Sequence, residues 1–118
     1  MKVGKHSYGF ENVYSWDDKI RLTKGKFCSI AEGVSSLLGG EHRMDWITTY
    51  PFSARGNVWV DTELIPGHPA SKGEIVIEND VWISHGALIL SWVHIRDGTV
   101  IGTGEVVNEN IEDYAIVA

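Results

Sequence analysis

The chain has 118 residues, of which 43% are apolar, and a formal net charge of −6. This length suits one domain of ordinary globular composition. The lysines and arginines form no dense cluster, so we do not expect a nucleic-acid-binding protein. There is no apolar run of eighteen residues and no apolar segment after Met1, so neither a membrane span nor a secretory signal is expected. A single cysteine, Cys28, excludes an internal disulfide, and together these features favour a cytoplasmic location.

The first thirty residues combine strand-like and turn-like stretches. Residues 10–18 are rich in turn formers and predict a loop, whereas residues 20–23 alternate apolar and polar side chains as a strand does. Lys24 stands where the repeat described below would place an inward aliphatic residue, so we expect its side chain to snorkel or to face outward and the coil to be distorted. Cys28 is expected to pack as a small buried hydrophobe.

Residues 35–72 show no regular period. A long interruption in a repeat sequence predicts a loop extruded from the scaffold, and such loops usually carry function. All three prolines of the chain lie here, together with several aromatic residues.

From residue 75 onward, a period of six residues dominates. Aliphatic, β-branched residues recur at every sixth position: Ile77, Ile83, Ile89, Ile95, Ile101 and Val107. A second set precedes each of them by two residues: Ile75, Val81, Ala87, Val93, Thr99 and Glu105. This period fits neither an α-helix nor one long strand, but it is the signature of a hexapeptide β-helix, in which three hexads form one coil of about eighteen residues. The alternative is an ordinary antiparallel β domain with accidental spacing.

The stretch from Gly73 to Val107, GEIVIENDVWISHGALILSWVHIRDGTVIGTGEVV, resembles the hexapeptide-repeat acyltransferases, specifically the xenobiotic (streptogramin and chloramphenicol) O-acetyltransferase branch. The segment KGKFCSIAEGV at residues 24–34 is similar to the same enzymes. The resemblance implies an all-β fold, a left-handed parallel β-helix, as one domain over residues 1–118 with the loop insertion at about 35–72. The handedness follows from the resemblance and not from the period.

The same resemblance implies a catalytic residue and an acceptor pocket in the loop. The motif GGEHRMDW followed by TTYPF places the general base of these enzymes at His42. An imidazole suits the removal of a proton from a hydroxyl nucleophile near neutral pH. Trp46, Tyr50, Pro51 and Phe52 would then form one wall of an acceptor pocket. The alternatives are a histidine held by local hydrogen bonds and aromatic residues that only pack the loop down.

Along the coil, the resemblance implies a site for acetyl-CoA. Its expected residues are Trp82, Ser84, Gly86, Ala87, Gly102, Thr103 and Gly104. Gly86 and Gly104 are eighteen residues apart and should stack at one corner, although corners need small residues in any case. Some glycines typical of these enzymes are replaced here, by Glu78, Ser84, Trp92 and Arg96. The histidines lack zinc-site spacing, so no metal is expected.

These observations predict an acetyl-CoA-dependent O-acetyltransferase that acts on a hydroxylated small molecule, antibiotic or sugar-like. We expect a homotrimer with sites between subunits, because Trp82 and Trp92 would otherwise leave apolar surface exposed. The resembled enzymes continue past the position of Ala118 with a basic C-terminal helix that commonly helps to hold CoA. The alternative hypothesis is therefore a non-catalytic trimeric relic or binding module.

Overall fold

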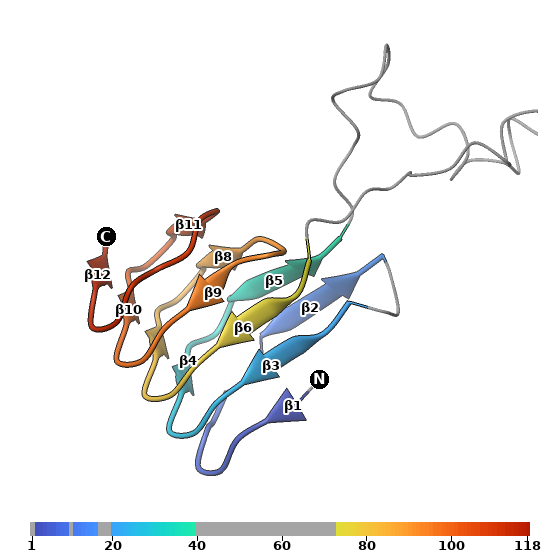
Figure 1. Ribbon diagram of the computed structural model, residues 1–118. Helices are drawn as coiled ribbons and strands as arrows, with labels where there is room; N and C mark the ends of the chain where they lie inside the picture. The colour runs from blue at the N-terminus through green and yellow to red at the C-terminus, as the bar shows by residue number, and fades with distance from the viewer. Residues whose placement is uncertain (1, 10, 17–19, 40–72) are drawn as a thin grey trace, which may run out of the picture.

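The computed structural model describes residues 2–9, 11–16, 20–39 and 73–118, and the regular elements in these ranges are all strands (Figure 1). Sheet A contains β1 (Lys2–Val3), β3 (Leu22–Lys24), β6 (Ile75–Ile77) and β9 (His94–Ile95). Sheet B contains β4 (Ser29–Ile30), β7 (Trp82–Ile83), β10 (Val100–Ile101) and β12 (Ile116–Val117). Sheet C contains β2 (Asn12–Ser15), β5 (Ser35–Leu38), β8 (Leu88–Ile89) and β11 (Val106–Val107). In the described ranges, no helix is long and apolar enough to cross a membrane.

The chain visits sheets A, B and C in turn, so that successive coils stack in parallel register. Trp82 pairs with Val100 in sheet B, and Leu88 pairs with Val106 in sheet C, each pair eighteen residues apart. Three hexads therefore make one coil, as the period of six predicted. The all-β class and the parallel β-helix are confirmed, and the arrangement agrees with the left-handed form that the resemblance implied.

Both aliphatic sets point into the coil and form its core. The residues at every sixth position from Ile77 to Val107 are at most 2% exposed, and the preceding set is equally buried up to Thr99. The Thr99 hydroxyl is satisfied because its one proton can be donated to the Arg96 carbonyl at 2.8 Å or to the Glu112 carbonyl at 3.2 Å. Cys28 is fully buried and unpaired, which confirms its predicted role as a small core residue.

Three columns of corners join the sheets, and we name each column by the sheets that it connects. The A/B corner contains His6, Phe27, Asp80, Gly98 and Tyr114, all with positive φ. The B/C corner contains Gly33, Gly86 and Gly104, again with positive φ. At the C/A corner, Trp92 has a φ of 71° and Gly73 a φ of 129°. A left-handed residue is therefore needed at most corners, but glycine is not required to supply it.

Sheet C begins earlier in the sequence than expected. Strands β2 and β5 occupy stretches that were predicted as loop, and they pair with each other from Asn12↔Ser35 to Ser15↔Leu38. These strands were not predicted because polar residues occupy their inward positions. Ser36, for example, is buried and pairs with Ile89, which holds the same inward position in the next coil. Residues 35–39 thus belong to the scaffold and not to the insertion.

The prediction for Lys24 was wrong. Its side chain points into the coil, and the residue is only 5% exposed. The Lys24 Nζ donates a hydrogen bond to Glu11 Oε2 at 3.0 Å, so the buried cation has a buried counter-charge. The coil keeps its regular register here, with Lys24 paired to Val3 on one side and to Ile77 on the other.

Candidate active site

The B/C corner is built from stacked tight turns. Ser84 and Gly102 each begin a four-residue turn, because their carbonyls accept hydrogen bonds from the Ala87 and Glu105 amides at 3.4 and 3.3 Å. Gly86 and Gly104 hold the third position of these turns with φ of 74° and 72°, as a type II turn requires. The Gly104 amide donates to the His85 carbonyl at 2.9 Å, which stacks one turn on the other. The predicted stacking of Gly86 and Gly104 is confirmed.

At two positions of this corner, packing within the chain does not explain the absence of a side chain. A Cβ atom added to Gly104 would meet nothing within 4 Å, and one added to Gly86 would meet only the Gly104 Cα at 4.0 Å. Elsewhere the same positive φ is held by bulky residues such as Phe27, Trp92 and Tyr114, despite a cost of about 1–2 kcal/mol each. We call the column of Gly33, Gly86 and Gly104 the glycine ledge; its backbone is open at Gly86 and Gly104, whereas the His85 ring lies beside Gly33.

The other predicted donor residues differ in their access to this ledge. Trp82 lies on the outer face of sheet B with 54% of its surface exposed, and Thr103 is exposed at the turn. Ser84 is buried, and a Cβ on Gly102 would lie 3.0 Å from the Val117 carbonyl oxygen. The Ala87 side chain is fully buried in the core, because it belongs to the second inward set. Its methyl group therefore cannot contact a bound ligand.

Two residues of the ledge were missed in the sequence. Gly33 continues the glycine column, and its missing side chain leaves room for the His85 ring, whose Cε1 lies 3.2 Å from the position of a Gly33 Cβ. The insertion concealed this relationship, since it separates the paired residues Ser35 and Leu88 by 53 positions instead of eighteen. The place of His85 at the ledge is likewise a result of the tertiary structure.

The predicted acceptor side cannot be placed in the same way. His42, Trp46, Tyr50, Pro51 and Phe52 lie outside the described residues. β5 ends and β6 begins at the C/A corner (Figure 1), where the Trp92 amide donates to the Gly73 carbonyl at 3.0 Å. Trp92 thus lies at the C/A corner, and sheet C separates it from the glycine ledge of its own chain.

A ladder of acidic residues runs along the A/B corner. Carboxylate oxygens of Glu78, Asp97 and Asp113 lie within 4.8 Å of one another. Asp97 Oδ1 accepts from the Asn79 amide at 2.8 Å, Asp113 Oδ1 accepts from the Asp97 amide at 3.1 Å, and Glu78 pairs with His94. These bonds tie one coil to the next and account for the cluster as a structural feature.

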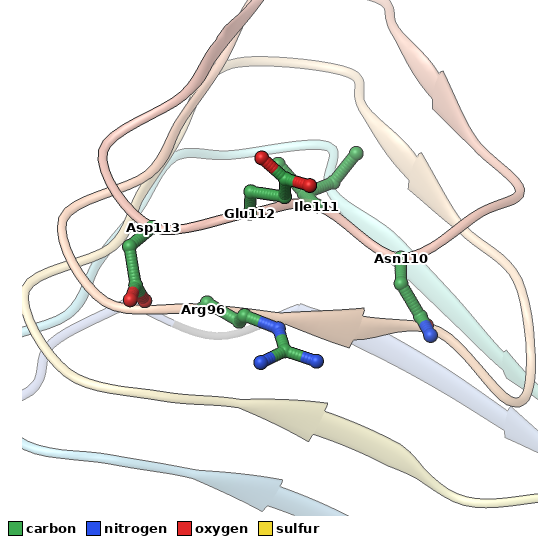
Figure 2. A pocket seen from close by; sticks show the side chains of 5 residues that line it. All are labelled: Arg96, Asn110, Ile111, Glu112 and Asp113. Carbon is green, nitrogen blue, oxygen red and sulfur yellow. The ribbon is translucent and has the colours of Figure 1, made fainter.

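A polar hollow of about 480 Å³ lies beside the end of this ladder (Figure 2). It is lined by Arg96, Asn110, Ile111, Glu112 and Asp113. In Figure 2, the side chains of Asn110 and Asp113 project from one coil toward the neighbouring coil, which carries Arg96. None of the predicted donor residues lines this hollow.

Comparison with curated proteins gives several similar sequences. A chloramphenicol acetyltransferase of Agrobacterium fabrum (strain C58) is 38% identical over 132 aligned residues, which cover 99% of this chain and 62% of that protein. A probable macrolide acetyltransferase of Lysinibacillus sphaericus is 43% identical over 97 residues, covering 81% of this chain and 54% of that protein. A chloramphenicol acetyltransferase of Klebsiella aerogenes is 34% identical over 99% of this chain and 62% of its own length.

The chain therefore spans between 54% and 62% of the length of these relatives. No family model matches it. The chain is a homologue of named chloramphenicol and macrolide acetyltransferases, in agreement with the resemblance seen in its motifs.

Proposed function

We propose that the protein transfers the acetyl group of acetyl-CoA to a hydroxyl group of a small molecule. The observation that carries this proposal is the glycine ledge, an open strip of backbone in a chain homologous to acetyltransferases. Because the relatives are named for chloramphenicol and macrolides, hydroxylated antibiotics of these two kinds are the first acceptors to test.

The donor is proposed to lie along the ledge. A narrow pantetheine chain can approach a backbone closely only where no side chain intervenes, and Gly86 and Gly104 provide that space. Trp82, half-exposed on the adjoining sheet B, offers an apolar surface to the same ligand. His85 and Thr103 supply polar groups at the turns, while Ala87 contributes only to the core beneath.

His42 is proposed as the general base, with Trp46, Tyr50, Pro51 and Phe52 forming the acceptor wall. In this reaction the imidazole removes the proton of the acceptor hydroxyl as its oxygen bonds to the thioester carbonyl carbon. The carbon–sulfur bond then breaks, and the CoA thiolate leaves and takes up a proton. A positioned base of this kind typically contributes about 10²–10⁴-fold to the rate.

We further propose that complete sites form between subunits of a homotrimer. Within one chain, the segment that carries His42 departs from the C/A corner, whereas the ledge is at the B/C corner, across sheet C. A neighbouring copy would bring the two together. The outer face of sheet B also carries exposed apolar side chains, Tyr8, Trp82 and Ile116, that an interface would bury.

The test has two readouts on the full chain. Thiol release from acetyl-CoA is measured with chloramphenicol, a macrolide and a set of hydroxylated sugars as acceptors. Thermal unfolding is measured with CoA, which at 100 times its dissociation constant should add about 2.7 kcal/mol to the free energy of unfolding. A protein that neither releases thiol nor responds to millimolar CoA would be a non-catalytic binding module instead.

A further inference from the structure

A second hollow, of about 450 Å³, lies on sheet A beside the A/B corner, away from the glycine ledge. Its floor is backbone, since Gly4 and Gly25 lie where the coils approach closely. A Cβ on Gly25 would lie 2.5 Å from the Glu78 carbonyl oxygen, and one on Gly4 would lie 2.5 Å from the Gly25 carbonyl carbon. Side chains are therefore excluded from the floor, and the walls are formed by Lys2, Thr23, Lys26 and Asn79.

The charge around this hollow is opposite to that of the protein as a whole. Residues 2–9, 11–16 and 20–39 contain five cations, Lys2, Lys5, Arg21, Lys24 and Lys26, and two carboxylates, Glu11 and Glu32. Residues 73–118, by contrast, contain eight carboxylates and one arginine. The cations thus gather in the first coils, while the net charge of the chain is −6.

The hydrogen-bonding groups of the hollow are nearly all donors. Among the described residues, the ammonium groups of Lys2 and Lys26 have no ion-pair or hydrogen-bond partner. The Asn79 Oδ1 accepts from the Lys26 amide at 2.8 Å, which leaves the Asn79 amide nitrogen as a donor. The one carboxylate in the lining, Glu78, is bonded to His94 and lies within 4.8 Å of the Asp97 and Asp113 carboxylates.

We propose that this hollow binds a phosphate group of a small-molecule ligand. A phosphate offers only acceptors, matching two ammonium groups, a hydroxyl and an amide. Lysine binds phosphate as a point charge, whereas recognition of a planar carboxylate favours the fork of arginine, and no arginine lines this hollow. The site does not depend on the proposed acetyl transfer, because it lies on a different sheet from the ledge.

The test is a two-dimensional ¹H–¹⁵N NMR titration of the full chain with inorganic phosphate, against sodium chloride at equal ionic strength. We expect saturable shifts at the Gly4 and Gly25 amides. Lys2→Gln and Lys26→Gln should each weaken binding roughly fivefold, the range of an exposed charge pair. Lys5→Gln is the matched control, since Lys5 is exposed in the same coil but does not line the hollow. Shifts that do not saturate, or equal effects of the Lys5 and Lys26 variants, would overturn the proposal.

A second titration, with acetyl-CoA, identifies the source of the phosphate. If Lys26→Gln also weakens acetyl-CoA binding, the hollow binds a phosphate of the donor. If it weakens only inorganic phosphate, the ligand is a separate phosphorylated molecule. A variant of the ledge, Gly86→Asn, separates the two proposals, since it should impair acetyl-CoA binding and leave the phosphate titration unchanged.

Discussion

Lys24 Nζ lies 3.0 Å from Glu11 Oε2 inside the coil, and the two side chains are only 3% and 2% exposed. The hydrogen-bonding capacity of the pair is incompletely used, because Glu11 Oε1 is buried without a hydrogen-bond partner among the described residues. The Ser36 hydroxyl is also buried without such a partner. Each charge of such a buried pair stabilises the other, since either one alone would be a buried charge without a counter-charge and would lower the free energy of unfolding.

Removing one charge of this pair should strongly destabilise the fold. Glu11→Gln leaves the Lys24 ammonium buried without a counter-charge, so we expect the free energy of unfolding to fall by about 3–5 kcal/mol. The double variant Glu11→Val with Lys24→Ile should have the same free energy of unfolding as the wild type, or one higher by about 1–4 kcal/mol. The reason is that these apolar residues resemble those at the equivalent positions of the next coil. Urea denaturation measures both, with the exposed Glu32→Gln as control. A single variant as stable as that control would refute this account.

A side chain on the glycine ledge should block the donor without unfolding the protein. Asparagine tolerates positive φ, so Gly86→Asn should cost little stability while it fills the open ledge. Calorimetry should then show weakened CoA binding. Asp80→Asn places the same residue at another positive-φ position, on the A/B corner, and should leave CoA affinity as it is. Equal affinities for the two variants would remove the ledge from the donor site.

Replacement of His42 tests the proposed general base. His42→Ala should lower acetyl transfer by roughly 10²–10⁴-fold and should remove the acid limb of the pH profile of kcat/KM. CoA affinity should hardly change, because the imidazole acts on the acceptor proton and not on the donor. Thiol release and CoA calorimetry on wild type and variant give both quantities. Full activity in the variant would assign the base elsewhere.

Trp92 offers a test of how neighbouring subunits meet. It lies at the C/A corner beside Gly73, so within its own chain it does not cover the ledge. We expect Trp92→Gly to leave CoA affinity unchanged and to relieve about 1–2 kcal/mol of left-handed strain, partly offset by lost packing. Tighter CoA binding by this variant would instead place Trp92 across the donor groove of a neighbouring copy.

The assembly prediction is measured directly. Sedimentation should show a species of three 13.1-kDa chains, because the outer face of sheet B exposes Tyr8, Trp82 and Ile116. Trp82→Ser should weaken the assembly, whereas Val13→Ser, on sheet C, should not. A monomer that stays stable at micromolar concentration would contradict both the trimer and sites shared between subunits.

Much of this architecture is readable in the sequence, because a solenoid repeats its chemistry at a fixed interval. The aliphatic residues from Ile75 to Val107 determine the period, the inward faces and the core, and the spacing of Gly86 and Gly104 determines which turns stack. These are relationships between neighbouring coils of equal length, so counting along the chain is sufficient to find them.

The remaining features were decided by tertiary structure, since they join residues whose separation follows no period. Lys24 and Glu11 form an ion pair across two coils of unequal length. The sequence does not indicate which carboxylate will pair with the lysine. Gly33 joins the glycine column, and Ser36 lies opposite Ile89, although Ser35 and its partner Leu88 are 53 positions apart in the sequence.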